Sequence, residues 1–156
     1  MRLRTTTLLS ILATIFLTGI AIAQNPAGNA SARDKLIGAW HLVSIESPGT
    51  DGKLNRVTDC KGQLVYTRDG HMSVQLMYPP SQSTLSNDYV LNGYEASFGT
   101  YDVDEAANTV THHVQASVTR GLVGKSLARA IQFSDGDLII KSVRADEHWS
   151  VTWRHD

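Results

Sequence analysis

Two adjacent histidines stand at the centre of Thr109–Val118, TVTHHVQASV. Histidine is the side chain best suited to proton transfer or metal binding near neutral pH. The stretch alternates in residue type as a β-strand does, and successive strand residues point to opposite faces. His112 and His113 therefore cannot both bind one metal ion from a regular strand, and we expect no metal site here. His112 shares its side with Val110 and Val114, so the pattern places His112 in the interior and His113 outside.

The partner of His112 depends on how the preceding hairpin is closed. A three-residue loop at 106–108 would put Asp102 opposite His112 and Tyr101 opposite His113, whereas a two-residue loop would put Tyr101 opposite His112. The first register offers an Asp–His dyad, in which the carboxylate makes the imidazole a stronger general base. The second offers a Tyr–His pair suited to hydrogen-bonding a ligand carbonyl. A purely structural histidine fits either register, so the sequence leaves these alternatives open.

Arg129 is a further residue that could take part in binding or chemistry, because the sequence pattern places its charge among apolar residues. It alternates with Leu127, Ile131 and Phe133, and so shares a face with apolar residues. A buried arginine needs a partner. That partner would be a carboxylate such as Asp102 or Glu46, or else the carboxylate or phenolate of a ligand.

Further candidates are side chains that combine an apolar body with a polar or polarizable group. Such side chains can line a cavity and still bind the polar end of a ligand. The predicted ligand contacts are Tyr66, Met72, Gln75, Tyr94, Tyr101, His112, His113 and Arg129.

Other sequence motifs for chemistry are missing or fail on inspection. GLVGKS at 121–126 has Thr119 where a phosphate-binding loop needs its first glycine, and an expected strand rather than a helix follows it. The sequence has no Gly-x-Ser-x-Gly elbow, zinc-protease helix, cysteine pair or dinucleotide fingerprint. We therefore expect no cofactor.

The elements that position these residues are short runs rich in Val, Ile, Thr, Tyr and Trp, separated by turn-forming residues. Tight hairpins are expected at 68–70, 106–108 and 135–136, and short helical turns at 31–36 and 89–96. Antiparallel strands must protect their edges, and closing the sheet does so. The sequence thus predicts an all-β, eight-stranded antiparallel up-and-down β-barrel with a short N-terminal helical turn. A β-sandwich is the alternative, with long connections near 47–61 and 79–96. The expected strands are 36–46, 62–68, 71–78, 97–104, 109–118, 127–134, 137–143 and 148–155.

The N-terminus has the pattern of a secretory signal peptide. Arg2 and Arg4 precede an uncharged run, residues 5–23, that ends in Ala21-Ile22-Ala23. Cleavage after residue 23 of the 156 would leave 133, with a linker at 24–35 and one barrel domain at 36–156. We expect an exported protein, periplasmic or secreted, with no membrane insertion after cleavage.

Charge and cysteine content narrow the expected partners. The chain has 14 basic and 15 acidic residues, and loss of two signal-peptide arginines would leave 12 against 15. This balance disfavours nucleic acid as a partner. Cys60 is the single cysteine, so it cannot form an internal disulfide. A half-buried thiol is the simplest interpretation, and a reactive thiol or one that links a homodimer is the alternative.

Several stretches resemble the bacterial and fungal lipocalin-like domain family. Gly38-Ala39-Trp40 is similar to the lipocalin G-x-W signature, and LIGAWHLVSIE, GQLVYTRDGHMSVQLM, GYEASFGTYDVDEAANTVTHHV and LVGKSLAR extend the resemblance from Leu36 to Arg154. In such barrels the tryptophan closes one end and a late arginine lies across its ring, which assigns barrel closure to Trp40 and Arg154. The chain departs from the pattern at Ser97, where an aromatic is expected, and near Arg120 and Leu122, where proline and tryptophan are expected.

The resemblance implies a barrel that binds a small, mostly apolar molecule, although related barrels have become isomerases or cyclases. Our first hypothesis is therefore an exported lipocalin-like protein that binds a small hydrophobic or amphipathic molecule in the barrel interior. The alternative is a cofactor-independent isomerase or cyclase that uses His112, with Asp102 or a tyrosine as its partner. A structural role in the cell envelope would instead require a filled interior and an exposed apolar patch.

Overall fold

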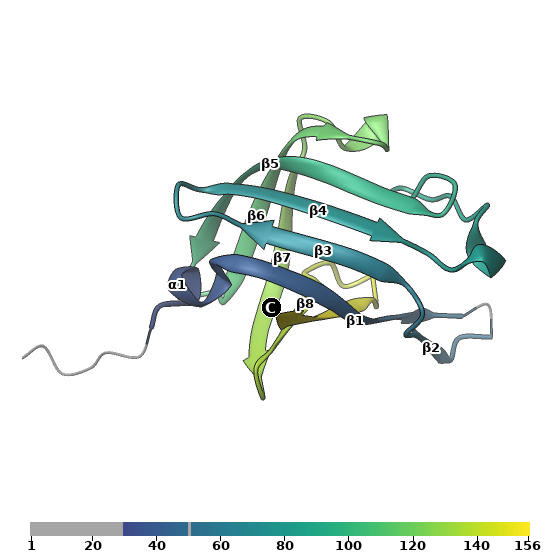
Figure 1. The fold of residues 1–156 in the computed structure, drawn as a ribbon, viewed down its shortest axis with the longest axis horizontal. Coiled ribbons are helices and arrows are strands. Elements are labelled where there is room, and N and C mark those ends of the chain that lie inside the picture. Colours follow the sequence, from purple (N-terminus) through teal and green to yellow (C-terminus); the bar gives the residue numbers. More distant parts are fainter. Residues whose placement is uncertain (1–29, 50) are drawn as a thin grey trace, which may run out of the picture.

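Apart from one short strand, the second along the chain, the order of the strands in the sheet follows their order in the chain, and the first strand also pairs with the last. The computed structural model describes residues 30–49 and 51–156. The expected signal peptide at 1–23 and the first half of the expected linker lie outside the described residues. Every pairing between strands is antiparallel (Figure 1). The helices and strands are α1 (Ala32–Leu36), β1 (Gly38–Pro48), β2 (Leu54–Val57), β3 (Lys61–Tyr66), β4 (His71–Met77), η1 (Pro80–Gln82), β5 (Tyr94–Asp104), β6 (Thr109–Ser117), η2 (Arg120–Leu122), β7 (Ser126–Ser134), β8 (Asp137–Ser142) and β9 (Ser150–His155).

The predicted eight-stranded up-and-down barrel is confirmed, and a ninth short strand is added to it. β1 is long enough to pair first with β3, over 38–41, and then with β2, over 45–48. On its other edge β1 pairs with β9. The barrel therefore consists of β1 and β3 to β9, while β2 extends the wall at one end. This closed order excludes the β-sandwich.

The turn residues explain why the strands form a meander. Asn108 and Asp135 both have positive φ, 51° and 52°, a conformation that asparagine and aspartate tolerate better than most residues. They lie in the β5–β6 and β7–β8 connections, where tight hairpins were expected. The predicted turn at 31–36 is α1, but the helical turn predicted at 89–96 is wrong. The chain turns at Gly93, with φ of 75°, and β5 begins directly after it.

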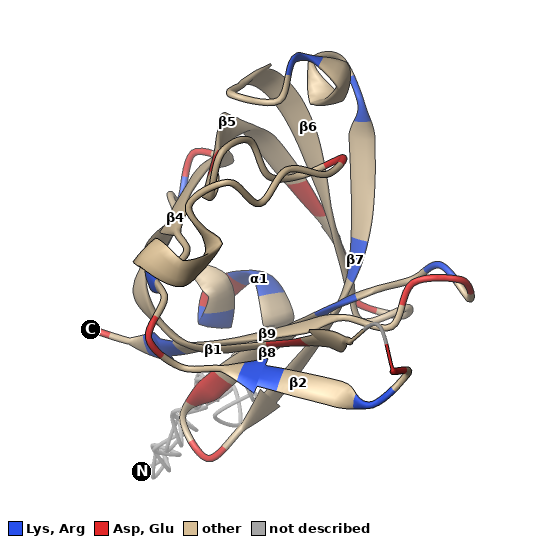
Figure 2. Cartoon of the chain, turned by 90° about the vertical axis from the view of Figure 1, so that its right-hand side faces the viewer, with Lys and Arg blue, Asp and Glu red and all other residues tan. Residues whose placement is uncertain are grey.

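The short helix α1 closes one end of the barrel. The backbone N–H groups of Ala32 and Arg33 donate to the carboxylate of Glu105, at 2.8 and 3.0 Å, which fixes the helix to the β5–β6 turn. Leu36, at the end of the helix, is fully buried. Figure 2, drawn from the opposite end, shows α1 across the far opening of the barrel.

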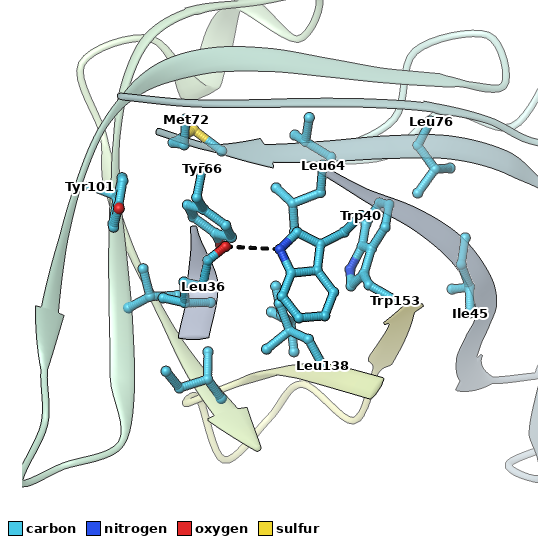
Figure 3. Packing of buried hydrophobic residues seen from close by; sticks show 14 of the residues in the cluster. Leu36, Trp40, Ile45, Leu64, Tyr66, Met72, Leu76, Tyr101, Leu138 and Trp153 are labelled. Atoms are coloured by element: carbon cyan, nitrogen blue, oxygen red, sulfur yellow. Dashed lines mark hydrogen bonds between the residues drawn. The ribbon is translucent and has the colours of Figure 1, made fainter. Parts of the chain in front are cut away.

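Trp40 packs beneath α1, but the expected arginine does not cover it. Its indole N–H donates to the carbonyl of Leu36 at 2.8 Å (Figure 3), and the ring of His155 meets its ring edge-on with centroids 4.7 Å apart. Arg154 instead points outward and pairs with Asp137, at 2.8 and 3.0 Å. The assignment of barrel closure to Trp40 and Arg154 is thus wrong for Arg154. The reason is the strand period: Trp153 faces inward, so its neighbour faces solvent and the next residue, His155, returns to the inner side.

Buried side chains fill the α1 end of the barrel. Tyr66, Tyr101, Val110 and Leu138 are each at most 2% exposed and pack with Leu36 in one cluster (Figure 3). None of these five lines the large interior cavity described below. One half of the barrel is therefore filled by its own side chains, and the other half is hollow.

Candidate functional site

The hollow half of the barrel is a cavity of about 600 Å³ that is lined from each of the nine described strands. This volume lies within the range of small-molecule sites. The loops around it belong to the end opposite α1. Its apolar wall consists of Ile45, Val57, Leu64, Val74, Leu76, Leu85, Val90, Leu122, Leu127, Ile140, Val151 and Trp153, and its polar and aromatic groups include Asn55, Tyr78, Gln82, Asn87, Tyr89, Glu95, Ser97, His112, Arg129 and Trp149.

Arg129 projects from β7 into this cavity, as the alternation predicted. It is 8% exposed. Its guanidinium carbon lies 5.2 Å from the centroid of the Tyr89 ring and 5.0 Å from that of the Trp149 ring. Neither predicted protein partner contacts it, since Asp102 lies on the outer surface and Glu46 pairs with Arg56 at 3.6 Å. The rings stabilise the charge by cation–π contact.

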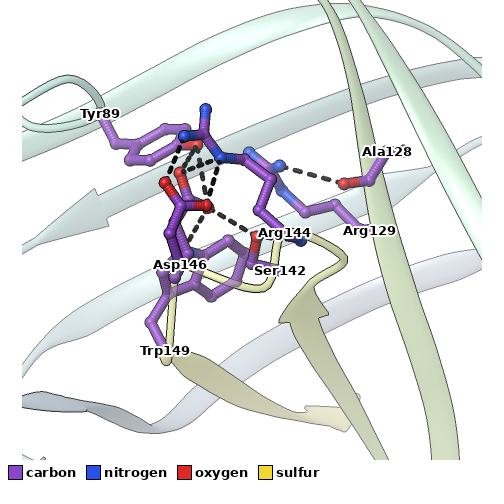
Figure 4. Close-up of polar contacts among 8 residues, drawn as sticks. Tyr89, Ala128, Arg129, Ser142, Arg144, Asp146 and Trp149 are labelled. Carbon is purple, nitrogen blue, oxygen red and sulfur yellow. Dashed lines mark hydrogen bonds and ion pairs between the residues drawn. The ribbon is translucent and has the colours of Figure 1, made fainter.

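Glu147 holds the two rings in place from behind. Its carboxylate accepts hydrogen bonds from the Tyr89 hydroxyl at 3.2 Å, the Trp149 indole N–H at 3.1 Å and the Ser142 hydroxyl at 2.6 Å. These hydrogen bonds, with the hydroxyl of Ser142 first, lower the pKa of Glu147, and the nearby Arg144 acts in the same direction (Figure 4). The carboxylate therefore stays ionised and ties the loop before β5 to the loop before β9.

Glu95 is the acidic residue among the groups that line the cavity. Burial raises its pKa from 4.5 to about 7, and the positive charge of Arg129 opposes this change without cancelling it. The two side chains share the cavity but are not within ion-pair distance of each other. Near neutral pH the carboxyl is therefore divided between its neutral and ionised forms.

His112 lies deeper in the cavity, with a tyrosine as its hydrogen-bond partner. Its Nε2 atom is 2.7 Å from the hydroxyl of Tyr66. Burial, helped by the charges of Arg129 and His113, lowers the pKa of His112 to about 3, so the imidazole is neutral. Of the two predicted registers the structure has the second, in which Tyr101 is opposite His112. Tyr101 does not bond to it, however, and donates to the carbonyl of Thr67 at 2.9 Å.

The predicted Asp102–His112 dyad is not formed. Asp102 faces outward, where its carboxylate accepts a hydrogen bond from Nε2 of His113 at 2.9 Å. His113 also contacts the hydroxyl of Ser126 through Nδ1, at 2.9 Å. This Ser–His–Asp chain lies on the outer wall, and neither of the two described hollows of the surface includes its members. It is therefore separate from the interior cavity.

The other predicted ligand contacts are spread over the barrel. Met72 and Tyr101 are core residues at the α1 end, and Tyr66 reaches the cavity through its bond to His112. Tyr94 is 53% exposed, and Gln75 lines a shallow groove on the outer face of β4, β5 and β6. Of the eight predicted contacts, His112 and Arg129 line the cavity.

The aromatic residues and the acid were not predicted from the sequence. Tyr89 lies in the loop before β5, where no periodicity indicates which way a side chain points. Trp149 fell within the strand expected at 148–155, and its alternation with Val151 and Trp153 was the signal that could have placed it on the inner face. Glu95 fell within the helical turn wrongly expected at 89–96. Its position in β5, two residues before Ser97, would have placed it on the inner face had the strand been extended to its true start.

Two further features bear on the kind of site. Within residues 30–49 and 51–156, no three histidine, cysteine, aspartate or glutamate side chains come together as a metal site. None of the described helices has the length and apolar character needed to cross a membrane.

An up-and-down barrel with one plugged end and a ligand-sized hollow at the other is the architecture of lipocalin-type proteins. The chain belongs to the lipocalin-like domain family, whose model matches residues 37–155. No curated protein matches the sequence.

Solved structures are similar to this chain at low sequence identity. A lipocalin-like protein from Bacteroides uniformis is 12% identical, with a TM-score of 0.46, over 78% of this chain and 99% of that one. An uncharacterized protein from Bacteroides eggerthii is 14% identical, with a TM-score of 0.47, over the same shares. A mutant of the fluorescent protein UnaG is 12% identical, with a TM-score of 0.40, over 78% of this chain and 96% of that one.

Proposed function

We propose that this protein binds a small hydrophobic or amphipathic molecule inside its barrel. The observation that supports this function is the cavity of about 600 Å³, whose wall combines a continuous set of aliphatic side chains with polar groups such as His112 and Arg129. Burial of an apolar molecule against the aliphatic part is favourable by roughly 25 cal/mol per Å² of apolar surface removed from water. The polar groups would then fix its orientation.

The observed contacts of His112 favour binding over the isomerase or cyclase alternative. A general base works best when its pKa lies near the working pH. The pKa of His112 lies far below that range, and its hydrogen-bond partner is a tyrosine rather than a carboxylate. Its place in the cavity suits a neutral hydrogen-bonding contact to the ligand.

We further propose that the protein is exported and works in the periplasm or outside the cell. The basic start, the uncharged run and the Ala21-Ile22-Ala23 ending support this proposal. Mass spectrometry of the protein recovered from a periplasmic extract should give a chain that begins at Gln24. Recovery of the intact 156-residue chain from the cytoplasm would contradict export.

Binding can be tested with a variant that fills the cavity. Leu127 lines the cavity, whereas Gln132, on the same strand, is exposed. The purified protein, the Leu127→Trp variant and the Gln132→Trp control would each be incubated with a lipid-soluble cell extract and analysed by native mass spectrometry. The unsubstituted protein and the control should retain small molecules that the cavity variant loses. Retention of the same molecules by all three proteins, or by none, would contradict the proposed function.

A further inference from the structure

We propose that the ligand is a monocarboxylate with an apolar body, and that Arg129 binds its carboxylate. This inference rests on the proposed function and adds the chemical class of the ligand. It depends on the contacts of one buried cation, on the two rings that hold it, and on the groups that share its cavity.

The Arg129 guanidinium makes few polar contacts with the described residues. It donates one hydrogen bond to a described residue, from Nη1 to the carbonyl of Ala128 at 3.2 Å. No carboxylate of residues 30–49 and 51–156 lies within ion-pair distance of it. Exposed arginines of the same chain are better satisfied: Arg144 pairs with Asp146 at 2.6 and 3.0 Å, and Arg154 pairs with Asp137 in the same bidentate way. A buried charge is costly unless it is paired, so Arg129 is suited to receive an anion.

The Arg129 guanidinium is held in a fixed orientation. Tyr89 and Trp149 both contact the guanidinium, and Glu147 fixes both rings through hydrogen bonds. The N–H donors of a guanidinium lie in its plane, and a guanidinium held in a fixed position presents them in a fork that matches the two oxygens of a carboxylate. Because the site is already held in place, little side-chain entropy would be lost on binding.

His112 can make a second polar contact with the ligand. The buried hydroxyl of Tyr66 has its one described hydrogen bond with Nε2 of His112, and burial keeps the pKa of Tyr66 far above its ordinary value, so the hydroxyl stays protonated. If Tyr66 donates this bond, its hydrogen is satisfied, and the neutral imidazole carries its own hydrogen on Nδ1. His112 is paired with Leu127, two residues before Arg129 on β7, so both groups face the same region of the cavity. His112 then offers an N–H to a second oxygen of the ligand or to the carboxylate itself.

The charged groups of the cavity favour a ligand with a single negative charge. Glu95 lines the same cavity and adds negative charge when it is ionised. A singly charged carboxylate is attracted by Arg129 and repelled less by Glu95 than a dianion would be. The aliphatic wall provides no second cation, because Arg129 is the one basic side chain among the lining residues that the structure describes.

The test compares acids with their esters. Dansyl-labelled straight-chain carboxylic acids of several lengths, and the methyl esters of the same acids, would be titrated by fluorescence into the purified protein. We expect the best acid to bind the unsubstituted protein roughly tenfold to a hundredfold more tightly than the Arg129→Met variant, the range for a charge-assisted hydrogen bond. The ester should bind both proteins alike. Arg68→Met, which removes an exposed arginine near α1, is the matched control and should change neither affinity.

A second variant keeps the test decisive if Arg129→Met does not fold. Glu95→Gln removes the opposing charge and should strengthen binding of the acid at pH 8 several-fold, without changing binding of the ester. Equal binding of acid and ester to the unsubstituted protein, or an unchanged affinity for the acid in Glu95→Gln, would overturn the carboxylate assignment and leave the binding function intact. Failure of every acid and every ester to bind would instead contradict the proposed function itself.

Discussion

Replacing Glu95 by glutamine should make the protein more stable at pH 8 and should change its stability at pH 5 much less. The side chain keeps its shape in this substitution but loses its ability to ionise. In the folded protein, burial among the cavity residues raises the pKa of Glu95 from 4.5 to about 7. Folding therefore favours the protonated form of this carboxyl.

The sign and size of the effect follow from this difference in pKa. Because the folded state holds the proton more tightly than the unfolded state, the contribution of Glu95 to stability is full below pH 4.5 and is lost as the pH rises through about 7. A change from 4.5 to about 7 corresponds to about 3 kcal/mol. Glu95 is half-buried and faces a cavity, so solvent screening reduces the expected value to about 2 kcal/mol.

Urea unfolding of both proteins at pH 5 and pH 8, followed by tryptophan fluorescence, measures this contribution. All other titratable groups are common to both proteins, so their contributions cancel when the two differences in unfolding free energy are compared. Asp88→Asn, an exposed acid in the loop before β5, controls for the loss of one negative charge. If Glu95→Gln changed the unfolding free energy equally at both pH values, or stabilised the protein only at pH 5, the electrostatic account of the cavity would be refuted.

Three further outcomes are expected. Tyr66→Phe should lower the unfolding free energy by about 1 to 3 kcal/mol in urea titrations, because it leaves Nε2 of the buried His112 without its partner; an unchanged value would show that this bond contributes nothing to stability. Gly99→Ala should lower the unfolding free energy by about 3 kcal/mol or more in urea titrations, since its methyl group would overlap a backbone carbonyl of β6, whereas Gly121→Ala, which meets open space, should be nearly neutral in the same assay. Burial, followed by the charge of an adjacent aspartate, raises the pKa of the Cys60 thiol to about 11, so at pH 8 it should react with a disulfide reagent slowly until the protein is unfolded; rapid reaction of the folded protein would contradict this burial.

The main strands could be predicted because their cause is local. Alternation of apolar and polar residues, bounded by turn residues, placed all eight strands of the barrel. The strand β2 could not be found in this way, because its four residues, LNRV, are largely exposed and lack a buried face. It forms because β1 continues beyond the point where β3 leaves it and presents an unpaired edge.

The register of the β5–β6 hairpin is a feature that the alternation of apolar and polar residues could not predict. The carboxylate of Asp104 accepts hydrogen bonds from the backbone N–H groups of Ala106 and Ala107, both at 3.0 Å, and Asp104 pairs with Thr109. This bonding of a side chain to the turn decides which residue lies opposite His112. It leaves no mark in the alternation, so two registers remained open from the sequence.

The candidate site could also be predicted only in part. The inward direction of Arg129 and His112 follows from strand alternation and could be predicted. The rings that flank Arg129 come from loops far apart in the sequence, so only the folded chain brings them together. The outward direction of Arg154 was available from its neighbour Trp153, but the family resemblance led to the wrong residue.

The pairing of β1 with β9 has a consequence for how the protein is made. His41 and Asp156, which meet at this seam, are 115 positions apart, and β9 is the last strand of the barrel to be synthesised. Contacts between such distant segments form slowly, so the seam should be a late event in folding. Until β9 has been made and has paired with β1, the sheet carries two bare strand edges that can pair with other molecules. Deletion of β9 should therefore cause aggregation out of proportion to the contacts removed.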